Sequence, residues 1–71
     1  MPKTESWDTK LKSLKAQFTK SYDNLLADER SLVIVIIEDR PYSWNRAFDE
    51  IKAETELGKK ILLRLKELGI L

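Results

Sequence analysis

The chain has 71 residues without cysteine or histidine, and 13 basic residues against 12 acidic ones give a net charge of +1. This composition excludes disulfides, Cys/His zinc sites and every catalytic triad that uses histidine as its base. The chain is 42% hydrophobic and 35% charged, with two glycines and two prolines. We therefore expect a helical protein with no enzymatic activity, no cofactor, no metal and no small-molecule substrate.

Charge is distributed unevenly along the chain. Residues 1–20 and residues 57–71 each carry a net charge of +3, whereas residues 21–56 carry four basic and nine acidic residues, a net charge of −5. Basic ends favour a phosphate-binding surface or attraction between the ends of one copy and the middle of another. Solvated helix faces produce the same distribution.

No targeting or membrane-spanning segment is visible in the sequence. The N-terminus has no apolar stretch before a cleavage site. The longest apolar run, Leu32 to Ile37, is far shorter than the roughly 20 residues that span a bilayer. We expect a cytoplasmic protein with no membrane contact.

The first helix is expected over residues 7–26, after a disordered lead over residues 1–5 and with Ser6 as its N-cap. Apolar side chains recur there at steps of three and four, as on one face of an α-helix, at Trp7, Leu11, Leu14, Phe18, Tyr22 and Leu25. Core packing would use this face. The same steps fit a heptad seam against a second copy of the chain.

The next segment, residues 29–39, allows two interpretations. Five of the six residues from Leu32 to Ile37 are β-branched, which is typical of a buried strand. No second strand of similar quality is evident, and a lone strand would leave its backbone groups unpaired. We therefore expect a buried helix capped by Asp28, with Ile34 and Ile37 almost fully buried. The alternative is an intermolecular sheet between two copies.

Two further helices are expected after the break at Arg40-Pro41-Tyr42. Ser43 is placed to cap a helix over residues 44–53, and Thr55 to cap a helix over residues 56–68. Gly69 stands where a left-handed C-terminal cap belongs. The predicted fold is a compact all-α four-helix bundle, one domain over residues 1–71, in which a long N-terminal helix precedes a three-helix unit.

Residues 32–71 resemble a winged-helix/helix-turn-helix domain that lacks the wing. The similarity lies in an apolar helix ending at Glu38-Asp39, the turn Arg40-Pro41-Tyr42-Ser43, a short helix carrying Trp44, and a Thr-capped helix ending in Leu68-Gly69. The resemblance implies that residues 56–68 are a recognition helix whose polar face enters the major groove.

On a helical wheel at about 100° per residue, Leu57, Ile61, Leu65 and Leu68 form the expected core face of that helix. Leu63 falls on the opposite face, between Lys59 and Lys66. An outward leucine carries no hydrogen bond to a base edge, and its charged surroundings suit a protein contact, although single exposed leucines are common.

We expect a small regulatory protein that binds DNA as an oligomer or within a complex. The alternative is a protein–protein interaction module with no nucleic-acid contact. On the first hypothesis the phosphate contacts come from Arg46, Lys59, Lys60 and Arg64. A homodimer is expected in either case, with its interface at Trp7, Leu11, Leu14 and Leu63.

Overall fold

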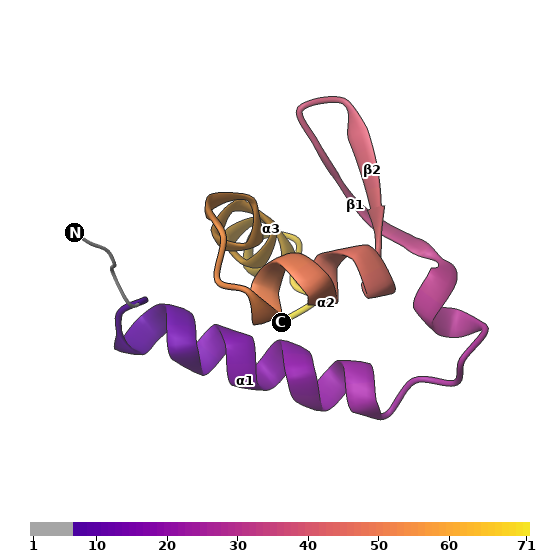
Figure 1. Ribbon diagram of the computed structural model, residues 1–71, viewed down its shortest axis with the longest axis horizontal. Helices are drawn as coiled ribbons and strands as arrows, with labels where there is room; N and C mark the ends of the chain where they lie inside the picture. Colours follow the sequence, from indigo (N-terminus) through magenta and orange to yellow (C-terminus); the bar gives the residue numbers. More distant parts are fainter. Residues whose placement is uncertain (1–6) are drawn as a thin grey trace.

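The computed structural model describes residues 7–71, so the expected disordered lead and the Ser6 cap lie outside the described residues. In chain order its elements are α1 (Thr9–Asp23), the 3-10 turn η1 (Glu29–Ser31), β1 (Val33–Ile37), β2 (Arg40–Ser43), α2 (Trp44–Lys52) and α3 (Glu56–Glu67). Helix α1 lies across α2 and α3, and the β1–β2 hairpin projects from the other side of the helices (Figure 1). This is an α+β fold, so the prediction of an all-α four-helix bundle was wrong.

The segment predicted as a helix over residues 29–39 is η1 followed by β1. Strand β1 pairs antiparallel with β2, with Val35 opposite Tyr42 and Ile37 opposite Arg40. Its five residues are all valine or isoleucine, whose stiff side chains favour a strand. The partner strand that seemed to be missing is Arg40–Ser43. It was overlooked because it is short and contains a proline.

The hairpin turn consists of Glu38 and Asp39, with φ angles of 51° and 68°. Two consecutive left-handed residues are what a type I′ turn requires, and Asn-Gly or Asp-Gly is its usual signature. Glu-Asp gives no such signal in the sequence. Hydrogen-bonded and non-hydrogen-bonded pairs alternate along an antiparallel ladder. Ile37 and Arg40 form the hydrogen-bonded pair that flanks the turn, so the next pair, Ile36 and Pro41, is not hydrogen-bonded. Pro41 is tolerated there because the ladder needs no N–H from it.

The hairpin turns one face toward the helices and the other toward solvent. Val35 is 4% exposed and Tyr42 is 8% exposed, whereas Ile36 is 61% exposed. Ile34 and Ile37 are partly buried, less than the helical interpretation predicted. A bulge between Val33 and Val35 shifts the register by one residue, which interrupts strict alternation along β1.

The apolar spacing predicted for the first helix is present in α1. Leu11, Leu14 and Phe18 are buried, although the helix is shorter than residues 7–26. Its N-cap is Asp8, whose carboxylate accepts a hydrogen bond from the backbone N–H of Leu11 at 2.9 Å. The ring of Phe18 lies 5.3 Å from that of Trp44, so α1 is fixed to α2 by aromatic packing.

Helices α2 and α3 begin at the predicted caps and pack closely together. The hydroxyl of Ser43 accepts from the N–H of Arg46, and that of Thr55 accepts from the N–H of Gly58. A Cβ atom at Gly58 would lie 2.6 Å from the carbonyl oxygen of Glu50. Glycine is therefore required for this approach of the two helices.

The C-terminus of α3 closes as predicted. Gly69 has φ 79°, and the N–H of Ile70 donates to the carbonyl of Leu65 at 3.0 Å, as in a Schellman motif. Within the helix, Leu62 is buried together with Ile61 and Leu65, whereas Leu68 is 52% exposed. Leu68 therefore does not belong to the buried face to which the helical wheel assigned it.

The core draws side chains from the three helices and both strands. Its fully buried large members are Phe18, Ile51, Ile61, Leu62 and Leu65. Between residues 7 and 71, no helix is both long enough and apolar enough to cross a bilayer.

Candidate functional site

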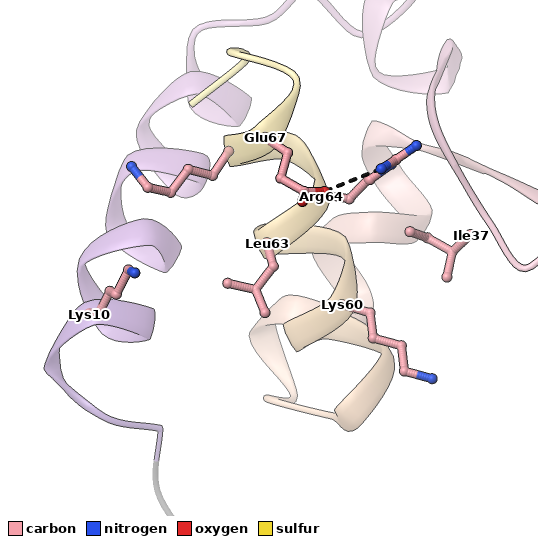
Figure 2. Close-up of a pocket in the computed structure, with 7 residues that line it drawn as sticks. Lys10, Ile37, Lys60, Leu63, Arg64 and Glu67 are labelled. Atoms are coloured by element: carbon pink, nitrogen blue, oxygen red, sulfur yellow. Dashed lines mark hydrogen bonds and ion pairs between the residues drawn. The ribbon is translucent and has the colours of Figure 1, made fainter.

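A groove runs along the outer face of α3, and we refer to it as the α3 groove. Its volume is about 660 Å³, and it is lined by Lys10, Ile37, Lys60, Leu63, Arg64, Lys66 and Glu67. Figure 2 shows Leu63 in the middle, with Lys10 of α1 on one side and Ile37 of β1 on the other. Three elements distant in sequence therefore contribute to one surface.

Leu63 supplies the apolar floor of this groove. Its neighbours Ile61, Leu62 and Leu65 point into the core with no more than 1% exposure, whereas Leu63 is 39% exposed. Successive helical residues are rotated by about 100°, so burial of those three side chains directs Leu63 outward. Ile37, at the end of β1, extends the apolar surface beyond α3.

The rim of the groove is cationic. It carries four basic side chains and one carboxylate, a net charge of +3. Two of the cations already have partners: Lys60 lies 2.9 Å from the carboxylate of Glu38, and Arg64 lies 3.2 Å from that of Glu67. The ion pairs among residues 7–71 do not include the other two, Lys10 and Lys66.

The pair of Lys60 and Glu38 links α3 to the hairpin turn. The hydrogen bond from the Lys60 ammonium lowers the pKa of the Glu38 carboxyl below its usual 4.5. The same contact raises the pKa of Lys60 above its usual 10.5. Both groups therefore stay charged at neutral pH, and the pair lies beside the groove at the hairpin turn.

The residues predicted to contact nucleic acid do not form one surface. Lys60 and Arg64 both line the α3 groove. Lys59 is on the same helix but outside the lining, and Arg46 lies on α2, where it pairs with Glu50 at 3.4 Å. Counting charges along the sequence did not reveal the pair of Lys60 with Glu38, because the two residues are 22 positions apart.

The residues predicted to form a partner interface also separate. Leu11 and Leu14 are 8% and 3% exposed and belong to the core of the chain itself. Trp7 packs against that core and is partly buried. Of the four, Leu63 alone presents an exposed side chain in this structure.

Sequence reasoning missed the contributions of Lys10 and Ile37 to this site. Lys10 was counted only as part of a basic N-terminal segment, and Ile37 was expected in the interior of a helix. Neither residue carries a local signal, since tertiary packing alone brings α1 and the end of β1 beside α3. Lys66 was noted next to Leu63 on the helical wheel, and Lys60 and Arg64 were named as phosphate contacts, so the sequence signals for this rim came from α3 alone.

The chemistry of the groove is that of a binding surface. It offers aliphatic contact, ammonium and guanidinium donors, and one carboxylate. In the described part of the chain, no group of three or more acidic side chains is arranged to hold a metal ion. Comparison of the chain with protein-family models, curated proteins and solved structures found no match.

Proposed function

We propose that this chain is a protein-interaction module whose α3 groove binds an acidic, amphipathic segment of a partner protein. The observation that carries the proposal is Leu63, an exposed leucine at the centre of a rim with a net charge of +3. An apolar centre inside a charged rim is the usual organisation of a protein interface. Leucines of the partner would cover Leu63 and Ile37, and its carboxylates would meet the rim.

Two cations that make no ion pair within residues 7–71 define where the acidic groups of the partner would lie. Lys10 and Lys66 stand outside the ion pairs of residues 7–71, so a carboxylate meets them without displacing an internal partner. Contacts at such rim positions contribute mainly to the association rate and to specificity. Most of the affinity would come from burial of apolar surface on both sides of the interface, at about 25 cal/mol per Å².

DNA binding is the second candidate function, and the arrangement of α2 and α3 favours it. The two helices are joined by three residues, as in a helix-turn-helix motif, and lysines lie on the outer face of α3. Two features support the protein partner instead. Lys60 and Arg64 are already engaged by carboxylates, and a leucine at the centre of the face offers a base edge no hydrogen bond, only contact with a thymine methyl group.

Fluorescence anisotropy with synthetic peptides tests the proposal. A panel of labelled peptides with leucines at helical spacing and glutamates between them, differing in register, is titrated with the protein at about 50 mM salt. Matched peptides with lysine in place of glutamate serve as the charge control. We expect binding of an acidic peptide with a Kd of order 10 μM, equivalent to roughly 7 kcal/mol, and none of the lysine series.

Two variants locate the binding site. Leu63→Glu should weaken binding by at least about tenfold because a carboxylate replaces the apolar floor. Leu26→Glu is the matched control, since Leu26 is 71% exposed and does not line the groove. Equal loss in both variants, or binding of duplex DNA together with no binding of any peptide, would contradict the proposal.

A further inference from the structure

The two outer edges of the hairpin differ in their capacity to pair with another strand. The sheet has two strands in the order β1-β2, so each strand has one edge without a partner. Pro41 and Ile36 form a non-hydrogen-bonded pair, in which the backbone N–H and C=O groups of each residue point toward the outer edge of its own strand. Proline has no N–H, so the outer edge of β2 lacks a donor there. Ile36 retains its N–H on the outer edge of β1.

Large apolar side chains are exposed to solvent along β1 and immediately before it. Leu32, Val33 and Ile36 are 60%, 57% and 61% exposed. An apolar strand with a free edge and no lysine or proline of its own is a template for strand addition.

We propose that β1 pairs antiparallel with β1 of a second copy of this chain, across a two-fold axis. The result is a four-stranded sheet in the order β2-β1-β1-β2. Ile36 and Val33 of one copy would then lie beside the β-branched side chains of the other, and such cross-strand neighbours stabilise a sheet.

Two observations identify a second copy as the occupant. Antiparallel pairing places the acidic Glu38-Asp39 turns of the two copies at opposite ends of the β1–β1 interface, whereas parallel pairing would bring these like charges side by side. Pro41 lies within each outer strand and leaves its free edge without a donor at that position, which disfavours addition of a further strand beyond four. A single free edge of identical sequence on each copy matches the self-complementary interface of a two-fold dimer.

This dimer is independent of the proposed function. The homodimer predicted from the sequence placed its seam at Trp7, Leu11 and Leu14, but Leu11 and Leu14 are buried within one copy. Pairing through β1 leaves those side chains in the core and does not require Leu63. Leu63→Glu therefore serves as a control that should weaken peptide binding in the α3 groove and leave the dimer intact.

Sedimentation equilibrium between about 10 and 100 μM tests the dimer. We expect a mass rising toward twice the 8.3 kDa of one copy. Ile36→Lys should raise the dissociation constant at least about tenfold, since an edge lysine blocks strand addition. Leu26→Lys, which places the same charge on a residue 71% exposed outside the hairpin, should not. Circular dichroism of both variants verifies that they are folded.

A backbone measurement keeps the test valid if Ile36→Lys perturbs the fold. In wild-type protein the amide of Ile36 should exchange with solvent more slowly at the upper concentration than at the lower one, because only the dimer supplies it with an acceptor. The proposal is overturned by a monomer mass across the range, by an unchanged dimer in folded Ile36→Lys, or by dissociation in Leu63→Glu.

Discussion

Replacing Gly58 by alanine tests the close packing of α2 on α3. Alanine is the better helix former by about 1 kcal/mol, so the sequence alone predicts stabilisation. In the structure the added Cβ would lie 2.6 Å from the Glu50 carbonyl oxygen and 3.0 Å from the Cα of Ile51. Both contacts are with backbone atoms, so rotation of a side chain cannot relieve them.

The magnitude follows from the separation that alanine would impose. Reaching an ordinary 3.4 Å contact from 2.6 Å requires the two helices to move apart by about 0.8 Å, which disturbs the Ile51, Ile61 and Leu62 packing between them. Overpacking of this kind costs about 3 kcal/mol, and the helix-propensity gain of about 1 kcal/mol offsets only part of it. The net loss of about 2 kcal/mol corresponds to a decrease in Tm of about 10 °C for a domain of this size.

Thermal unfolding followed by circular dichroism measures this change. The matched control is the reverse exchange at an open position, Ala16→Gly in the middle of α1, where Ala16 is exposed. It should destabilise by about 1 kcal/mol through propensity alone. A Tm of Gly58→Ala equal to or above that of the wild type would refute the close-packing argument.

Three other substitutions test separate parts of the structure. Val35→Asp should abolish folding because Val35 is 4% exposed and a buried unpaired charge costs several kcal/mol; folded protein by circular dichroism would contradict this. Asp39→Gly should raise Tm by a few degrees, since glycine adopts the φ of 68° at a lower cost of about 1 kcal/mol, and a lower Tm would count against the left-handed turn. The hydrogen bond from Lys15 lowers the pKa of Glu54 below its usual 4.5, so this pair stabilises the fold above that value and the contribution is lost as pH falls through the folded pKa. Glu54→Gln should therefore lose less Tm than the wild type between about pH 5 and about pH 3, and equal losses would exclude a role for the pair.

Local patterns in the sequence were sufficient to predict the apolar face of α1 and the positions and N-caps of α2 and α3. The apolar spacing of α1, the hydroxyl caps Ser43 and Thr55, and the left-handed Gly69 depend on residues close together in the chain. Each appears in the structure as expected. The physical reason is that helix formation and capping are governed by neighbours within four positions.

The hairpin could not be predicted in the same way, because its signals were either ambiguous or absent. The periodicity of a short continuous apolar run suits a buried helix as well as a strand, and no partner strand was recognised that would have decided for the strand. The turn uses Glu38-Asp39 where Asn-Gly is usual, and Pro41 indicated a break although it occupies an open position of the ladder. The α3 groove was predicted only through Leu63 and the basic residues of its own helix, since Lys10 and Ile37 reach it through tertiary packing.

NMR titration of the ¹⁵N-labelled chain tests whether the α3 groove binds an acidic amphipathic segment. The amide signals are followed while an acidic peptide from the panel is added. We expect the largest shifts to cluster at Ile37, Lys60, Leu63 and Lys66, and to disappear with the lysine-substituted peptide. Shifts confined to the outer face of α1, or shifts of equal size with both peptides, would contradict it.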